Sequence, residues 1–325
     1  LTVTYKLDLI SAVIMLSGIY YGAQYGGTIT SVLINIPGEA SSVVTCIDGY
    51  KMALQGKAGR ALGIAAFGSF FAGTCGTLVL SVLAPPLSRF ALMFGPAEYA
   101  ALVILGLTLV MYLGSGSPVK AMLMGALGLA VGTIGMDPAT AVERFTFGSQ
   151  SLIEGVNMAV LAMGLFGIGE VLFMAASAGA RASRDSIKYS SRLKDLLPDR
   201  SDWRVSLKPI GRGTLLGFFL GILPGGGAVI SSFASYAMEK RLSKHPEQCG
   251  KGAIEGVAGP ESANNSAAGG ALIHLLCLGI PGSGTTAILL GALIMLGLQP
   301  GPLLFQQQPQ FVWGLIASMY IGNVM

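Results

Sequence analysis

The sequence has little charge and few cysteines or histidines for its 325 residues. Asp, Glu, Lys and Arg make up 11% of it and hydrophobic residues 52%, whereas a soluble domain usually carries about 25% charged residues. The four cysteines form no CxxC pair, so neither a disulfide framework nor a zinc site is indicated, and the two histidines are too few for a His-rich metal cluster. Long blocks without a charged side chain, such as Ala61 to Pro86, are instead typical of helices that cross a bilayer.

The apolar blocks predict an all-α polytopic membrane protein. The 47 glycines fit this class, because glycine is common where membrane helices pack closely. The predicted spans cover residues 9–25, 61–84, 97–113, 117–136, 152–178 and 309–325.

Basic residues predict the orientation of these spans. The polar stretch from Ala180 to Arg212 holds nine basic and four acidic residues. Because apolar spans flank it, a cytoplasmic loop is favoured over a nucleic-acid-binding surface. Counting outwards, the loops at 48–60 and 114–120 fall on the same side, and they contain Lys51, Lys57, Arg60 and Lys120. We expect no nucleic-acid partner.

Residues 213–238 are apolar, yet both of their flanks are basic. The segment contains Leu223-Pro224-Gly225-Gly226-Gly227 near its middle, where proline removes a backbone donor and glycines permit a tight reversal. Twenty-six residues cannot cross a bilayer of about 30 Å twice as a helix. The pattern predicts a re-entrant hairpin, and a single span is the alternative.

Two further breaks resemble each other. The first break, Ile36-Pro37-Gly38, is followed by Ser41 and Ser42, and the second break, Ile280-Pro281-Gly282, is followed by Thr285 and Thr286. When Pro281 is superimposed on Pro37, the two hydroxyl pairs coincide, so a constant offset relates the two breaks. The first break leads to the basic loop 48–60 and the second to the uncharged loop 298–310. Repeats with loops of different charge suggest opposite orientation, and inverted repeats with broken helices place a transport site near the bilayer midplane.

Hydroxyl side chains follow both breaks. Helix amino termini offer unpaired N–H groups and partial positive charge, which suit a carboxylate. The residues expected to bind substrate there are Asn35, Pro37, Gly38, Ser41, Ser42, Pro281, Gly282, Ser283, Thr285 and Thr286, framed by Pro224, Gly225, Gly226 and Gly227. The alternative is that the hydroxyls only cap the helices.

A polar run, Gly259-Pro260-Glu261-Ser262-Ala263-Asn264-Asn265-Ser266, stands before an apolar stretch. Its carboxylate and amide oxygens suit a hard cation, and a capped loop is the alternative. The candidates for ion coupling are Glu261, Asn264, Asn265, Thr45 and Glu170, where Glu170 is also placed to pair with Arg181 or Arg184. Sodium is the metal that we consider; no firm metal site and no organic cofactor are expected, and the coupling ion is either sodium or a proton.

Enzyme motifs are weak. Gly282-Ser283-Gly284 with His274 resembles the motif of an intramembrane serine hydrolase, but Pro281 stands where that motif has glycine. We therefore expect no enzyme, with a hydrolase using Ser283 and His274, or a passive anion channel, as the rival functions.

Several motifs together resemble one family. They are Gly18 to Gly27 (GIYYGAQYGG), Asn35 to Gly38 (NIPG), Asp48 to Tyr50 (DGY), Arg144 to Gly148 (RFTFG), Leu165 to Glu170 (LFGIGE), Leu223 to Gly227 (LPGGG) and Gly259 to Asn265 (GPESANN). The chain is similar over its whole length to the large membrane subunit, TctA, of the tripartite tricarboxylate transporters. Family members extend further at both ends, and the amino-terminal extension would carry a Pro-Gly-Leu-Gly-Pro element that pairs with residues 224–227.

The resemblance implies a multi-pass subunit of a bacterial inner-membrane, secondary-active symporter. Its implied partners are a periplasmic solute-binding protein, a small four-helix membrane subunit and a citrate-like di- or tricarboxylate. The organisation that we expect has three parts. Residues 1–150 form a first repeat that lacks its amino-terminal hairpin, residues 151–212 a linking span with the basic loop, and residues 213–325 a second repeat with a hairpin at 223–227.

Overall fold

A computed structural model describes residues 6–95, 97–98, 100–101, 104–105, 108, 117–137, 140, 142–157, 160–161, 163–178, 197–223 and 227–324. Its elements are α1 (Leu9–Ile34), η2 (Ala40–Ser42), α2 (Val43–Leu54), α3 (Ala58–Ala91), α5 (Pro118–Gly132), β1 (Gly135–Met136), β2 (Glu143–Arg144), η3 (Gln150–Leu152), η4 (Met163–Ile168), α7 (Gly169–Ala178), α9 (Arg200–Ile222), α10 (Gly227–Leu242), η5 (Pro246–Gln248), α11 (Glu255–Leu278), α12 (Gly284–Met295), α13 (Leu304–Gln307) and α14 (Pro309–Val324). The prediction of a helical protein is confirmed. In the described part, the only strands are β1 and β2, an antiparallel pair of two residues each.

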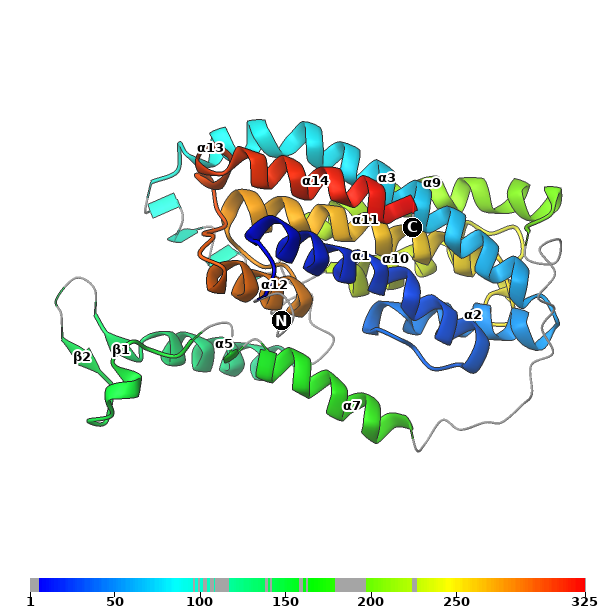
Figure 1. Cartoon of the computed structure of the whole chain (residues 1–325). Coiled ribbons are helices and arrows are strands. Elements are labelled where there is room, and N and C mark those ends of the chain that lie inside the picture. The colour runs from blue at the N-terminus through cyan, green and yellow to red at the C-terminus, as the bar shows by residue number, and fades with distance from the viewer. Residues whose placement is uncertain are drawn as a thin grey trace.

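Helix α11 is the centre of the molecule, and α1, α3, α9 and α10 surround it (Figure 1). Every residue from Gly256 to Cys277 is buried. This finding corrects one expectation, because residues 259–266 were expected at the polar entrance to a span and instead lie inside this buried helix. The polar side chains of this run must therefore find partners within the protein.

Glycines let α9 approach α11 closely. Gly213, Gly217 and Gly221 lie one helical turn apart on α9, and a Cβ atom added to each would lie 2.2 to 2.4 Å from a carbonyl oxygen of α11. The three oxygens belong to Gly259, Ala263 and Ala267. Small residues at this spacing bring helix backbones into contact, as in membrane helix pairs. Close packing of α9 on α11 is thus one structural reason for glycines in this sequence.

The largest of the apolar clusters among the described residues joins α1, α3, α11, α12 and α14. Leu272, Leu276, Leu293, Leu315 and Met319 are buried there with other side chains of α1, α3, α11, α12 and α14. In contrast, α3 exposes large apolar side chains on its outer face, including Phe67, Phe70, Phe71 and Val82. Such an exposed apolar surface is typical of a face that meets another apolar phase.

By length and composition, α3 is the one helix among the described residues that is long and apolar enough to cross a membrane. The predicted spans 9–25, 61–84, 117–136 and 309–325 coincide with α1, α3, α5 and α14, but α5 and α14 have 15 and 16 residues. Much of the predicted span 97–113 lies outside the described residues. The polytopic arrangement therefore stays a prediction.

The two helices that overlap residues 213–238 extend beyond this apolar segment at its two ends. Helix α9 begins at Arg200, inside the stretch that was expected to be a cytoplasmic loop, because Asp199 caps it by accepting hydrogen bonds from the N–H groups of Ser201 and Asp202, both at 2.8 Å. Helix α10 returns alongside α9. Arg212 of α9 donates to the buried Glu239 of α10 through Nε, at 2.9 Å, and through Nη2. The two helices therefore pack as a pair, whose placement in a membrane stays a prediction.

Candidate functional site

The first break interrupts the path from α1 to α2. Asn35 ends α1 with a φ of 55°, and the N–H of Ile36 donates to the carbonyl of Thr30 at 3.4 Å. The chain then folds back onto α1, where a Cβ atom at Gly38 would lie 2.4 Å from Cα of Gly27. Only glycine permits this approach. Asn35 and Gly38 thus have a clear structural use.

The second break has the same local geometry. Gly279 ends α11 with a φ of 71°, and the N–H of Ile280 donates to the carbonyl of His274 at 3.4 Å. Each of these positions corresponds to its counterpart in the first break by the same offset that relates Pro281 to Pro37. Gly282, the counterpart of Gly38, packs on the imidazole of His274, since a Cβ atom there would lie 2.2 Å from Nε2.

Hydroxyl groups cap the helix after each break. The N–H of Glu39 donates to Oγ of Ser42 at 3.2 Å, and the N–H of Ser283 donates to Oγ1 of Thr286 at 2.8 Å. Thr286 also accepts from Gly282 at 2.9 Å, and its own N–H donates to Oγ of Ser283 at 3.2 Å. The capping interpretation therefore holds for Ser42, Ser283 and Thr286, and their binding role stays a prediction.

The two broken helices run antiparallel. Figure 1 shows α2 at one end of the bundle and α12 at the other. Contacts between α1 and α11 agree with this direction, because Thr28 meets Glu261, whereas Gln24, one turn earlier, meets Asn264. The polar run of α11 consequently lies beside the middle of α1 and not at the second break.

Glu261 is the centre of a buried polar cluster. Its side chain is 1% exposed, and its carboxylate accepts hydrogen bonds from Oγ1 of Thr28, at 2.5 Å, and from Oγ1 of Thr45. Thr28 belongs to α1 and Thr45 to α2, so this carboxylate ties both sides of the first break to α11. Glu261 and Thr45, both candidates for ion coupling, are therefore in contact, and their role in coupling stays a prediction.

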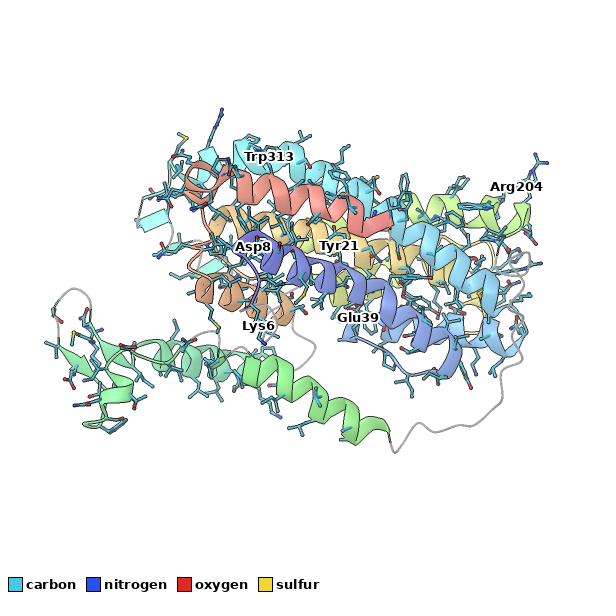
Figure 2. The ribbon with its side chains drawn as sticks, viewed as in Figure 1. Lys6, Asp8, Tyr21, Glu39, Arg204 and Trp313 are labelled. Atoms are coloured by element: carbon cyan, nitrogen blue, oxygen red, sulfur yellow. The ribbon has the colours of Figure 1, made fainter. Side chains whose placement is uncertain are left out.

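Glu39, which is labelled in Figure 2, brings a second carboxylate to the same cluster. Its Oε1 accepts from Oγ of Ser41 at 2.5 Å and from Nδ2 of Asn264 at 2.7 Å. With its amide nitrogen turned towards these groups, Gln24 donates to Glu39 at 3.1 Å and to Oδ1 of Asn264 at 2.5 Å. In all of these hydrogen bonds, the group that donates to Glu39 or Glu261 is a neutral hydroxyl or amide.

The neighbouring asparagines point to different elements. Asn264 faces Glu39, whereas Nδ2 of Asn265 donates to Oγ of Ser69 on α3 at 2.7 Å. Asn265 also donates to the backbone carbonyl of Glu261 at 3.0 Å, but none of its hydrogen bonds reaches the carboxylates. Successive residues of a helix point about 100° apart, so the two asparagines face different neighbours.

The other predicted residues are dispersed. Pro37 and Pro281 are partly buried within the breaks, and Thr285 is exposed. Pro224, Gly225 and Gly226 lie outside the described residues, whereas Gly227 begins α10 and approaches Ser283, with 3.3 Å between a Cβ added to the glycine and that of the serine. Glu170 is the second residue of α7, and its side chain lies outside the described part.

Sequence reasoning missed Glu39, Thr28 and Gln24. A signal for Glu39 was present, since it is the one charged residue between Asp8 and Asp48. No signal identified Thr28 or Gln24, because their partners on α11 lie far from them along the chain.

The hydrolase interpretation finds no support in the geometry. A serine nucleophile needs a hydrogen bond to its base, but Oγ of Ser283 contacts Thr286 at 3.1 Å. Neither ring nitrogen of His274 forms a hydrogen bond of normal geometry among the described residues, and none of the hydrogen bonds joins His274 to Ser283. Those residues also contain no group of three or more His, Cys, Asp or Glu side chains able to hold a metal ion.

Comparison with known proteins agrees with the resemblance. An uncharacterized 52.8 kDa protein in the TAR-I ttuC' 3'region of Agrobacterium vitis is 51% identical over all 325 residues, and the chain spans 64% of its length. A second uncharacterized protein, in the TAR-II ttuC' 3'region of the same organism, is 58% identical over 109 residues, which are 34% of this chain and 45% of that protein. No solved structure matches. The model of the tripartite tricarboxylate transporter TctA family matches residues 1–325, so the chain belongs to this family of transporters.

Proposed function

We propose that the chain is the transport subunit of a binding-protein-dependent secondary transporter, and that it imports di- or tricarboxylates such as citrate with a cation. Membership of the TctA family supports the transport class. The observation that carries the coupling is the cluster of the buried Glu261 and the partly buried Glu39 across the first break, with only neutral hydrogen-bond donors.

A buried carboxylate is stable only when it is neutral or paired with positive charge. None of the ion pairs among the described residues involves Glu39 or Glu261. The positive charge must then come from a proton or from a bound cation, and carboxylate, hydroxyl and amide oxygens suit sodium as well as protonation. A site of this kind binds a cation that accompanies an anionic substrate.

The proposed architecture is an inverted repeat in a bacterial inner membrane, with several spans and a re-entrant pair, α9 and α10. Its support is the equal geometry of the two breaks and the antiparallel course of α1 and α11. Broken helices in such repeats satisfy their freed backbone groups at a binding site. The proposed partners are a periplasmic binding protein and a small four-helix membrane subunit.

The test is citrate uptake into proteoliposomes that contain the full-length protein, the small subunit and the binding protein. Sodium and proton gradients are imposed separately, and we expect accumulation with one of them. Glu261→Gln is expected to abolish accumulation, because the amide neither carries the proton nor balances sodium, and to preserve exchange of citrate at equal concentrations. Glu247→Gln, in the exposed η5, is the matched control.

The same assay separates the rival functions. A passive channel equilibrates citrate under either gradient but never accumulates it. A hydrolase changes the substrate chemically, which mass spectrometry of the vesicle contents detects. If Glu261→Gln accumulates citrate as the wild type does, the assignment of coupling to this cluster is wrong.

A further inference from the structure

We infer that the two breaks bind opposite charges: the carboxylate of the substrate binds at the second break, at the start of α12 beside His274, and the first break holds the cation alone. This inference rests on the proposed transport function. It replaces the expectation that both breaks share one anionic substrate.

The first break already contains a carboxylate of the protein. Glu39 directly precedes η2 and α2, and Oγ of Ser41 in η2 donates to its Oε1. A helix start attracts anions, but here the attracted anion is Glu39 itself. Glu261 adds a second carboxylate in the same cluster. A substrate anion is repelled from this break, and a cation is attracted.

The second break has a neutral residue at the same position. Ser283 is the counterpart of Glu39 when the two breaks are superimposed, and its side chain and that of Thr286 cap one another. The first N–H groups of α12, at Gly284 and Thr285, have no acceptor among the hydrogen bonds of the described residues. Helix α12 has 12 residues, so its dipole favours an anion at this end. A carboxylate fits the free donors without meeting an acidic side chain in the described hydrogen bonds.

His274 is the second, independent feature of this break. Its side chain is 3% exposed, and its Nε2 edge faces Gly282, since a Cβ atom at that glycine would lie 2.2 Å from Nε2 and 2.4 Å from Cε1. Neither ring nitrogen forms a hydrogen bond of normal geometry in the described structure, where the ring makes only a weak polar contact with the backbone of Gly270, one turn earlier on α11. Buried polar groups are nearly always paired, so an unpaired imidazole at a break needs an explanation. A neutral imidazole offers one N–H donor, which a carboxylate in the break would accept.

The equivalent residue of the first break has no free donor. Thr30 is the counterpart of His274 in the same superposition and likewise packs on the break glycine, with its Oγ1 at 3.0 Å from a Cβ atom added to Gly38. Its hydroxyl donates to the carbonyl of Gly27 at 3.1 Å. The two breaks thus have one backbone design, and at this side-chain position only the second has a donor that forms no hydrogen bond of normal geometry among the described residues.

The first test compares matched variants in citrate exchange, with the full-length protein and its partner subunits in proteoliposomes. His274→Ala is expected to raise the KM for citrate about tenfold, the loss of one hydrogen bond to a charged group, with little change in the maximum rate. His274→Asn, which retains a donor, is expected to recover part of this loss. Thr30→Ala, the counterpart in the first break, is expected to change the KM for citrate less than about twofold.

A second test remains informative even if the His274 variants do not fold. In protein whose four cysteines are replaced, Thr285→Cys and Ala40→Cys place thiols on the exposed first turn after each break. Citrate is expected to slow the reaction of Thr285→Cys with a water-soluble thiol reagent and to leave that of Ala40→Cys unchanged. Equal protection of both thiols, or equal KM increases in Thr30→Ala and His274→Ala, overturns the inference. A wild type that exchanges no carboxylate overturns the proposed function instead.

Discussion

The contact between α9 and α11 gives a sharp prediction about the support of the polar cluster. A Cβ atom at Gly217 would lie 2.2 Å from the carbonyl oxygen and 2.5 Å from Cα of Ala263. Nonbonded carbon atoms prefer separations of about 3.5–4.0 Å, so in Gly217→Ala the two backbones must separate by about 1 Å. Both contacts are with backbone atoms, and no side-chain rotation relieves them.

The change in unfolding free energy of Gly217→Ala follows from two opposing effects. Overpacking of this kind costs about 1–3 kcal/mol, and replacing glycine by alanine inside a helix returns about 0.5–1 kcal/mol. Gly211, on the same helix, has no atom within 4 Å of an added Cβ atom, so Gly211→Ala receives only the second effect. The two variants should therefore differ by about 1–3 kcal/mol in unfolding free energy, with Gly211→Ala the more stable.

Gly217→Ala should lower transport activity as well as stability. Ala263 stands between Glu261 and Asn264 on α11, and Thr28 donates to Glu261 at 2.5 Å. A displacement of about 1 Å lengthens such a contact to roughly the limit of a hydrogen bond. Thermal unfolding in detergent and gradient-driven citrate uptake measure the two effects. If Gly217→Ala is as stable as Gly211→Ala and equally active, the close packing of α9 on α11 is refuted.

Two further predictions concern carboxylates outside the cluster. The carboxylate of Asp48, buried in α2, accepts from the N–H groups of Gly250, Gly252 and Ala253 at 2.7 to 2.9 Å, and from the hydroxyl of Tyr236. Asp48→Ala leaves three N–H groups without an acceptor and should cost at least about 3 kcal/mol in thermal unfolding, against about 1 kcal/mol for Tyr236→Phe; equal losses would contradict the contacts. The hydroxyl of Ser201 and the N–H of Asp202 hold the pKa of Asp199 at about 2. Because this pKa lies below the usual value of about 3.9, the cap is complete above about pH 4 and is lost as the pH falls through about 2. Hydrogen exchange in the first turn of α9 should accelerate over this range in the wild type but not in Asp199→Ala.

The sequence predicted features that depend on short stretches of chain. Proline and glycine at 36–38 and 280–282 cannot continue a helix, and the chain leaves its helices there: α1 ends at Ile34 and α11 at Leu278. The hydroxyl groups of Ser42 and Thr286, one turn beyond Glu39 and Ser283, act as caps because capping is a local interaction. The resemblance to TctA needed only motifs in order along the chain, and the family match confirms it.

The extent of the helices was less predictable. Charge in residues 200–212 suggested a loop, but the charged turns of α9 lie on the same helix as its apolar half and are begun by the Asp199 cap. Likewise, the polar run 259–266 looked like an exposed entrance. It is buried because α3, α9 and α10 enclose it and supply partners such as Ser69, and no local pattern encodes that enclosure.

The sequence by itself determined where the chain breaks, because backbone donors and φ angles are set by proline and glycine at each position. Only the tertiary structure decided which distant groups each break meets. Glu39 meets Asn264, and Glu261 meets Thr28 and Thr45, although the partners belong to distant parts of the chain. These contacts depend on the antiparallel course of α1 and α11. The two breaks already differ in sequence, because Glu39 stands in one where Ser283 stands in the other, and folding adds the second carboxylate, Glu261, to the first break.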